Sequence, residues 1–240
     1  MIFNRFIGAL LVAILSCAAH AQTVRFETNV GSFDMELNPT HEPQLQGNVD
    51  NLLQYVTSGR YDNTVINRAV PDFVLQMGVF QSPGAKPAAT ASGYNLIAAF
   101  PPVDGVPAAW IPGLSNTSGM VGFALSGDGA GGIDHNSATS SFYINLNNNS
   151  FLDNDFTIFA QIPNMATINA IMALSHVDYT QDPGFGADSG NLHFTDVPLL
   201  ANGDLVVITH AFVVAVPEPS VIALMCGLLL GVLARRSRSF

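Results

Sequence analysis

The chain has 240 residues, a net charge of −10 and 48% apolar residues, so it can build an ordinary globular core. All eighteen acidic residues except Glu218 lie between Gln22 and Val216, where only four residues are basic: Arg25, Arg60, Arg68 and Lys86. This acidic balance argues against nucleic acid as a partner, and the lack of cysteine in the same stretch excludes disulfides, thiol catalysis and cysteine-bound metal there.

The first residues have the pattern of an export signal. A short region with one charge, Met1 to Arg5, precedes an apolar run, Phe6 to Cys17, and Ala19-His20-Ala21 fits a small-x-small cleavage site. The run is too short to span a bilayer. We therefore expect residues 1–21 to be a signal peptide. The alternative is a lipoprotein box at Ile14-Leu15-Ser16-Cys17, which would leave an acylated Cys17 as the mature end.

The mature chain begins with a predicted pair of strands. Residues 23–29 and 32–37 flank an Asn-Val-Gly turn. The second strand alternates apolar and acidic residues, so one face should meet the core and the other water: Phe33, Met35 and Leu37 against Asp34 and Glu36.

A helix and a strand-rich segment follow. Apolar residues between Gln44 and Ser58 have helical spacing, and Gly59 stands where a C-capping glycine belongs. Val65 to Phe80 is rich in strand-forming residues, but Pro71 interrupts it and should lie at an edge or a bend.

The rest of the domain contains more short strands. Gln81 to Gly113, rich in Pro, Ala and Gly, is predicted to be a long surface excursion. Further elements are strands at 119–125, 141–146, 157–162 and 204–214, and a helix at 165–174. This pattern fits a closed β-barrel with two helices, although the pattern alone leaves other all-β and α+β folds open.

The C-terminal residues form a second targeting pattern. Val216-Pro-Glu-Pro-Ser220 precedes an apolar run to Ala234 and the basic segment Arg235-Arg236-Ser237-Arg238. Residues 215–240 resemble the PEP-CTERM sorting signal of Gram-negative bacteria, which implies transient membrane anchoring before cleavage by an exosortase-type protease. The expected location is the periplasm, the outer surface or the extracellular matrix. A simple C-terminal anchor would give the same orientation.

Several blocks resemble one enzyme family. Arg68, Pro71, Phe73 and Gln76 fit the pattern R-x-x-P-x-F-x-x-Q, and further blocks follow in the same order at 113–119, 136–144, 149–153 and 156–159. Together they resemble the cyclophilin-type peptidyl-prolyl isomerases. For residues 22–214 the resemblance implies a mainly β fold, a closed eight-stranded antiparallel β-barrel capped by two α-helices. It also implies a monomer that acts on proline-containing polypeptides without a cofactor or metal.

The resemblance assigns roles to individual residues. Arg68, Phe73 and Gln76 would be catalytic, with the arginine donating hydrogen bonds to the twisted prolyl amide and the glutamine helping to orient the arginine and the substrate. The expected substrate-binding residues are Val74, Phe123, Ser141, Tyr143, Phe151, Leu152 and Phe156. Taken singly, most of these would be ordinary core residues; their joint occurrence in family order carries the prediction.

Several positions depart from the family pattern. Met77 replaces a glycine, Leu125-Ser126 replaces a more polar pair, Ser141 replaces a glutamine, and Tyr143 adds a hydroxyl to a wall that is usually phenylalanine. These changes keep one alternative open, a catalytically weak proline-peptide binding module of the cell surface or exopolysaccharide matrix. The C-terminal signal alone leaves another alternative, a structural component of an exopolysaccharide matrix. The histidines are scattered, and the glycine-rich loop at Asp128 lacks the EF-hand ligand pattern, so we predict no metal site.

Overall fold

The structure, a computed structural model, describes residues 22–84, 94–180 and 192–215. Residues 21–214 belong to one compact unit. The predicted signal peptide at 1–21 and, apart from Ala215, the predicted sorting signal at 215–240 lie outside the described residues. Within the described ranges, no helix is both long enough and apolar enough to cross a membrane.

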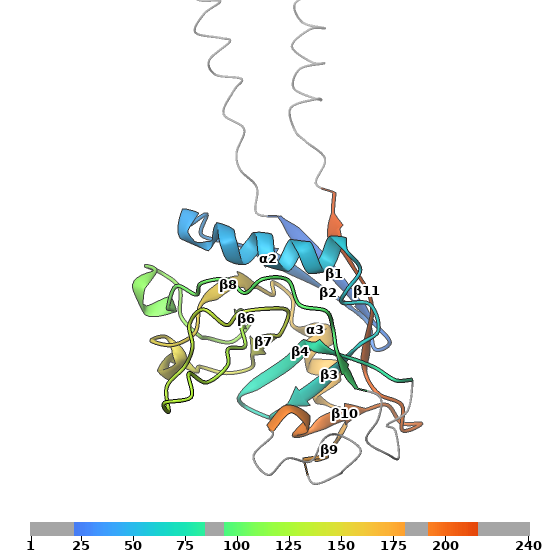
Figure 1. The fold of residues 1–240 in the computed structure, drawn as a ribbon. Coiled ribbons are helices and arrows are strands. Elements are labelled where there is room, and N and C mark those ends of the chain that lie inside the picture. Colours follow the sequence, from blue (N-terminus) through green and yellow to red (C-terminus); the bar gives the residue numbers. More distant parts are fainter. Residues whose placement is uncertain (1–21, 85–93, 181–191, 216–240) are drawn as a thin grey trace, which may run out of the picture. The chain divides into compact units, whose positions relative to one another are not determined.

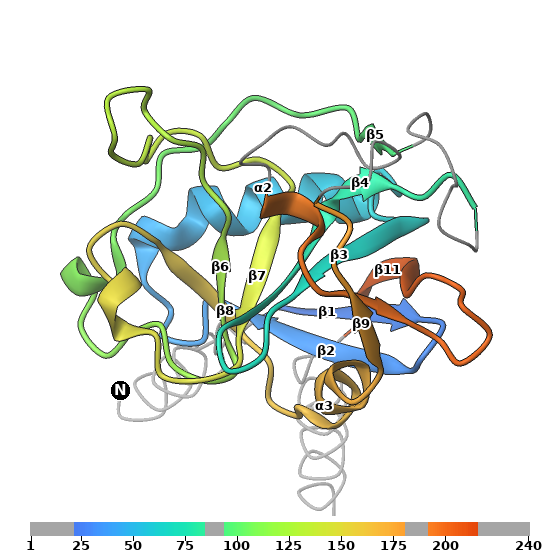
Figure 2. The same ribbon diagram turned by 90° about the horizontal axis from the view of Figure 1, so that it is seen from below.

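Eight antiparallel strands close into a barrel, which confirms the predicted fold class (Figures 1 and 2). Around the barrel they are β3 (Thr64–Ala69), β11 (Val207–Val214), β1 (Thr23–Thr28), β2 (Ser32–Leu37), β8 (Ile158–Gln161), β6 (Met120–Phe123), β7 (Phe142–Asn145) and β4 (Val74–Gln81). Strand β4 pairs back onto β3 and so closes the ring.

Three short strands outside the barrel were not predicted. Strand β5 (Asn95–Leu96) pairs with the end of β4. Strands β9 (Ser175–Val177) and β10 (Val197–Leu199) form a separate two-stranded sheet. A small apolar cluster joins this region to the barrel, and its buried members are Val65, Phe80, Phe194, Val197 and Leu205.

The first two strands follow the alternation in the sequence. The apolar residues Phe33, Met35 and Leu37 are at most 3% exposed, whereas Asp34 and Glu36 are partly exposed. Phe33 stacks on Phe26 of β1 with the ring centres 5.2 Å apart. The core of the barrel therefore begins with the residues that the period-two pattern assigns to it.

Helices α2 (Gln46–Thr57) and α3 (Ala166–Met172) pack against different sides of the barrel, α2 on β11 and α3 on β2 (Figures 1 and 2). Each is slightly shorter than predicted, and α2 is preceded by a 3-10 turn, η1 (Pro43–Leu45). Gly59 ends α2 with φ +68°. The amides of Gly59 and Arg60 bond back to the carbonyls of Val56 and Tyr55, which is a Schellman motif and confirms the predicted C-cap.

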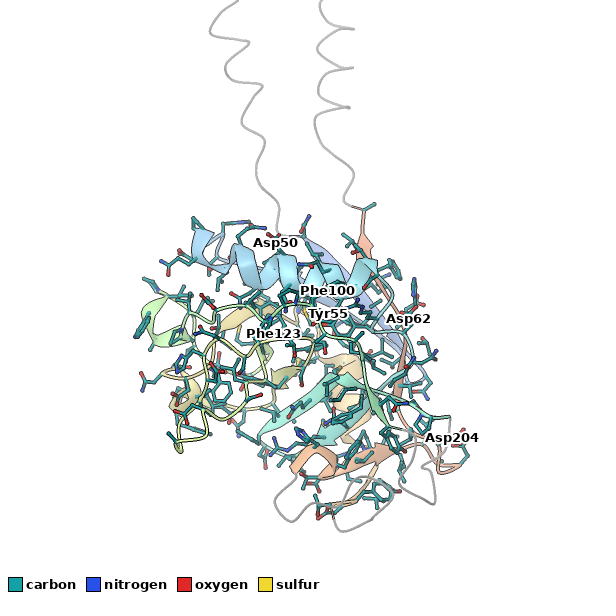
Figure 3. The ribbon with its side chains drawn as sticks, viewed as in Figure 1. Asp50, Tyr55, Asp62, Phe100, Phe123 and Asp204 are labelled. Atoms are coloured by element: carbon teal, nitrogen blue, oxygen red, sulfur yellow. The ribbon has the colours of Figure 1, made fainter. Side chains whose placement is uncertain are left out.

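The excursion after β4 is fastened to helix α2 by Arg60. Its Nη1 donates to the carbonyl of Ala98 at 2.5 Å, and its guanidinium carbon lies 3.6 Å from the centre of the Phe100 ring. The hydroxyl of Tyr55 accepts a 2.8 Å hydrogen bond from the Phe100 amide, and the two rings meet beneath the helix (Figure 3). One of the few cations of the domain is thus explained by packing.

Candidate active site

A β-bulge turns Arg68 out of the barrel. Strand β3 pairs with β4 through Ile66↔Met77, Arg68↔Gln76 and Ala69↔Leu75, with a register shift between Ile66 and Arg68. Ile66 and Ala69 are in the core, so strict alternation from Ile66 would also turn Arg68 inward. The extra residue, Asn67, changes this parity, as bulges beside functional sites commonly do. Arg68 therefore lies on the outer face.

A row of residues crosses four strands on this outer face. Arg68 lies opposite Gln76, Gln76 opposite Tyr143, and Tyr143 opposite Gly122. Cross-strand partners share a face of the sheet, so these side chains are neighbours. Val74 shares the face with Gln76 because the two are two residues apart on β4. The strand pairing brings together four of the predicted site residues: Arg68, Val74, Gln76 and Tyr143.

The guanidinium of Arg68 is half-buried, and Phe73 lies beside it. The guanidinium carbon is 5.5 Å from the centre of the Phe73 ring, a cation–π distance. The buried Nε atom has no hydrogen-bond partner among the described residues. Burial lowers the pKa of Arg68, and the charge of Asp196 partly opposes this shift. A buried donor without a partner is rare and calls for an explanation.

Tyr143 is held over Gly122 by a buried hydrogen bond. Its hydroxyl donates to Oδ1 of Asn116 at 2.7 Å. A Cβ atom at residue 122 would lie 2.5 Å from the Tyr143 hydroxyl oxygen, so only glycine leaves room for the ring. Burial, and to a smaller extent the charge of Asp153, raises the pKa of Tyr143 well above its usual value. The hydroxyl that departs from the family pattern therefore has a partner and stays protonated.

The turn after β7 carries the other predicted contacts. The turn η3 (Ser150–Leu152) is followed by Phe156, whose ring meets Tyr143 edge to face at 5.8 Å. The amide of Phe156 bonds to the carbonyl of Leu152 at 2.9 Å, which keeps these two residues in one turn. Phe151 is 68% exposed and stacks on Phe73 at 6.1 Å.

Three buried asparagines tie this turn to the strands, and the sequence did not reveal their role. Asn149 Nδ2 donates to the carbonyl of Phe73 and to Oδ1 of Asn145, both at 2.8 Å. Asn145 Nδ2 donates to Oδ1 of Asn116 at 3.1 Å. Asn116 donates to Asp153 through its amide and its side chain, at 2.7 and 2.9 Å. This asparagine network fixes Phe73, Tyr143 and the η3 turn relative to one another.

Gln76 and Ser141 contact each other. Gln76 Nε2 donates to Oγ of Ser141 at 3.3 Å. Within the described part of the chain, the side chain of Gln76 makes no hydrogen bond to Arg68. The family role of orienting the arginine is therefore not seen in this arrangement, although the two residues are cross-strand neighbours.

One predicted site residue lies elsewhere than the sequence suggested. Phe123 was predicted to bind substrate, but it is 1% exposed and stacks on Phe159 inside the barrel at 4.1 Å (Figure 3). That prediction is wrong, because Phe123 has the opposite strand parity to Gly122. Met77 likewise points into the core. The close contact that requires glycine is at Gly78, with φ +93° and the Ser140 carbonyl 2.8 Å from its ideal Cβ position.

In the glycine-rich loop at Asp128, the aspartate carboxylate accepts hydrogen bonds from the backbone of the loop itself. The amides of Ala130 and Gly132 donate to Oδ1 of Asp128 at 2.7 and 2.8 Å, and these bonds lower the pKa of that carboxyl. Across residues 22–84, 94–180 and 192–215, no group of three or more His, Cys, Asp or Glu residues is placed to hold a metal ion.

The chain is similar to known proteins of one family. Residues 23–184 match the family model for cyclophilin type peptidyl-prolyl cis-trans isomerase/CLD. A peptidyl-prolyl cis-trans isomerase of Streptomyces antibioticus is 32% identical over 131 residues, which cover 55% of this chain and 66% of that protein. One from Acinetobacter baylyi is 28% identical, over 64% of this chain and 74% of that protein. A peptidyl-prolyl cis-trans isomerase-like 1 of Gibberella zeae is 32% identical, over 59% and 76%.

Solved structures show the same fold. A cyclophilin-type peptidyl-prolyl cis-trans isomerase of Cryptosporidium parvum superposes with a TM-score of 0.55, at 20% identity, over 82% of this chain and all of that chain. A second crystal structure of the same protein, determined in the presence of the dipeptide Ala-Pro, gives a TM-score of 0.54 over 81% of this chain.

Proposed function

The chain belongs to the cyclophilin-type peptidyl-prolyl cis-trans isomerases, and on that premise we propose that the surface around Arg68 catalyses rotation of X-Pro bonds in exported polypeptides. Arg68, Phe73 and Gln76 are its proposed catalytic residues. Val74, Ser141, Tyr143, Phe151, Leu152 and Phe156 are its proposed substrate contacts. The Ala-Pro dipeptide used with the Cryptosporidium parvum protein supports a proline-containing peptide as the substrate class.

Rotation about an X-Pro bond requires few groups from the protein. Rotation about a peptide bond breaks amide resonance over a barrier of about 18–20 kcal/mol, and an uncatalysed X-Pro bond takes tens to hundreds of seconds to isomerise. A catalyst needs only to bind the twisted amide better than either planar isomer. In the twisted state the prolyl nitrogen regains a lone pair, so a fixed hydrogen-bond donor beside it stabilises the transition state.

The observation that carries the proposal is the unsatisfied Nε of Arg68. A buried Nε atom with no hydrogen-bond partner among the described residues is costly for folding, but it is a ready donor for a substrate atom. Phe73 lies beside it at 5.5 Å and offers an apolar surface for the proline ring. A charge-assisted hydrogen bond of about 1.5–3 kcal/mol, made only in the transition state, would accelerate rotation roughly tenfold to a hundredfold.

The test is cis–trans exchange of a short proline peptide, measured by NMR exchange spectroscopy with the purified chain. We expect the wild type to raise the exchange rate well above background. The Arg68→Ala variant should return most of the way to background while its circular dichroism spectrum stays native. A wild-type rate equal to background would refute the isomerase function.

The proposed site of action is outside the cytoplasm of a Gram-negative bacterium, where the enzyme would assist the folding of exported proteins. The support is the sequence at the two ends, with the signal-peptide pattern at 1–21 and the sorting-signal pattern at 215–240. Membrane association through the apolar run after Ser220 would be transient if an exosortase-type protease removes it. Intact-mass measurement of protein from the native host tests both ends, including acylation of Cys17. An uncleaved, unmodified mass would contradict the proposal.

A second candidate is a proline-peptide binding module with little turnover. It is favoured by one contact, the hydrogen bond from Gln76 to Ser141, because a glutamine engaged there does not orient Arg68. Titration of a proline-rich peptide separates the two functions. Chemical shift changes at Phe73 and Tyr143 without faster cis–trans exchange would favour binding alone.

A further inference from the structure

Trp110 is an exposed aromatic residue that the fold holds in place. It is the only tryptophan of the chain and is 72% exposed. It ends the 3-10 turn η2 (Ala108–Trp110), and Ala108 and Ile111 on either side are buried in the core. Residues three apart in such a turn share a face, so burial of these two turns Trp110 outward. Packing of its two neighbours therefore holds Trp110 at the surface.

The η2 turn is joined to the part of the chain that carries the predicted substrate contacts. The amides of Ala109 and Ala108 donate to the carbonyls of Asp153 and Phe156, at 2.9 and 3.2 Å. The η2 turn (green) and the η3 turn (dark yellow) lie side by side in Figures 1 and 2. Counting along the chain from Trp110 through these bonds to Phe151 gives at most roughly 18 Å between their Cα atoms.

The two exposed aromatic residues lie on turns that are hydrogen-bonded to one another's segments. Five large apolar side chains are exposed among the described residues: Leu96, Trp110, Phe151, Val177 and Val213. Isolated exposed apolar residues need no explanation, but Phe151 begins the segment 151–156 and Trp110 ends the turn that is hydrogen-bonded to that segment. Phe151 in turn stacks on Phe73, next to Arg68. An extended peptide advances about 3.3 Å per residue, so about five residues cover the span from Phe151 to Trp110.

We propose that Trp110 is a second apolar contact for the polypeptide substrate and takes a large apolar side chain several residues away from the isomerising proline. The proposal rests on the isomerase function. Its occupant is an extended, unfolded chain, because such a chain can place a proline at Arg68 and a large apolar side chain at Trp110 at once, whereas a folded protein buries most of its large apolar side chains. Trp110 would thereby favour unfolded clients over folded proteins that expose a proline.

Because Trp110 is the only tryptophan of the chain, its fluorescence reports directly on this contact. The full chain is titrated with 12-residue peptides that contain one proline and one leucine at varied separation, and with the tetrapeptide Ala-Ala-Pro-Ala. We expect a blue shift of the tryptophan emission with those long peptides whose leucine reaches Trp110, and none with the tetrapeptide. By calorimetry, Trp110→Ala should bind the responsive peptides about tenfold more weakly, as for the loss of one central interface aromatic residue.

Matched variants separate this contact from general effects. Trp110→Ala should leave tetrapeptide turnover unchanged, and Trp110→Phe should lose less affinity than Trp110→Ala. Leu96→Ala removes another exposed apolar side chain, on β5, and should change neither measurement. Equal long-peptide affinity in wild type and Trp110→Ala would overturn the proposal. Self-association of the chain through Trp110 that by itself accounts for the emission shift would also overturn the proposal. Absent tetrapeptide turnover in the wild type would refute the isomerase function instead, and long-peptide affinity would still report on Trp110.

Discussion

The hydroxyl of Tyr143 donates a 2.7 Å hydrogen bond to Oδ1 of Asn116, inside the protein and directly over Gly122. The family pattern has phenylalanine at this position, so the added oxygen required a partner. Asn116 supplies it and is itself held by Asp153. The asparagine network thus supplies the hydrogen-bond acceptor that the added hydroxyl needs, and the Tyr143 ring still faces Phe156.

Removing that hydroxyl should have a small effect. In Tyr143→Phe, Asn116 Oδ1 keeps its bond from Asn145 Nδ2, so the loss is one buried hydrogen bond, about 1 kcal/mol of unfolding free energy. Urea denaturation measures it. Because the ring remains, cis–trans exchange should change by no more than a few-fold. A variant that unfolds or loses all activity would show that the hydroxyl has a larger role.

Asp153 should matter far more. Its carboxylate accepts hydrogen bonds from Ser115 Oγ and from the amide and side chain of Asn116. In Asp153→Ala these donors lose their acceptor, and we expect a loss of about 2–4 kcal/mol by denaturation. KM should rise as Leu152 and Phe156 shift. The control Asp153→Asn keeps one acceptor oxygen and should lose less; equal losses would contradict this account.

The planar shape of the Arg68 side chain should be required, and its charge alone should not suffice. Arg68→Lys keeps the charge but loses the rigid, planar array of donors, so we expect a loss of about tenfold or more in the exchange rate with little change in stability. Arg60→Ala is the matched control, since Arg60 contacts Ala98 and Phe100. It should lower the melting temperature and leave the rate unchanged. Full activity of Arg68→Lys would show that charge alone suffices.

Two glycines with positive φ should respond differently to alanine. At Gly78 a Cβ atom meets the carbonyl of Ser140 at 2.8 Å, whereas at Gly113 nothing lies within 4 Å. Gly78→Ala combines backbone strain with a clash and should cost about 2–4 kcal/mol. Gly113→Ala has only the strain, about 1 kcal/mol. The free energies of unfolding in urea compare them, and a smaller loss at Gly78 would be inconsistent with its tight contact.

The ion pair between Arg25 and Asp34 should make the stability of the fold depend weakly on pH in the acid range. Arg25 donates to both oxygens of Asp34, at 2.7 and 2.8 Å, and this hydrogen bonding lowers the pKa of Asp34. A folded pKa below the unfolded value of about 3.9 means that the pair stabilises the fold above that pH and loses this contribution as the pH falls through the folded pKa. Because both side chains are partly exposed, the contribution is below about 1 kcal/mol.

The measurement is the stability difference between wild type and Asp34→Asn as a function of pH. It should be constant from pH 8 to pH 5 and should shrink below about pH 4. A difference that persists undiminished at pH 2 would mean that the carboxylate charge does not contribute.

Residues with strong local patterns were predictable. The alternation in β2, the helical spacing before Gly59 and the family blocks gave the barrel, helix α2 and most of the proposed site. Strands β9 and β10 were missed because each has only three residues and Pro198 interrupts the pattern. Their pairing joins segments about twenty residues apart, and local sequence does not encode that.

The error at the site concerns which face a side chain takes. Phe123 lies beside Gly122 of the outer row, and a shift of one position in a strand moves a side chain to the opposite face. The reverse holds for Arg68, whose outward direction depends on the bulge at Asn67. The asparagine network could also not be predicted from the sequence, because Asn116, Asn145 and Asn149 gain their roles only when separate segments meet.

The order of strands around the barrel also bears on when this protein can fold. Strand β11 lies between β1 and β3, so the last strand of the domain fills the gap between two of the first. Until residues 207–214 are available, β1 and β3 each have an unpaired edge and the ring stays open. Closure therefore follows synthesis of the whole domain. In such an incomplete chain the open edges of β1 and β3 can pair with a strand of another molecule.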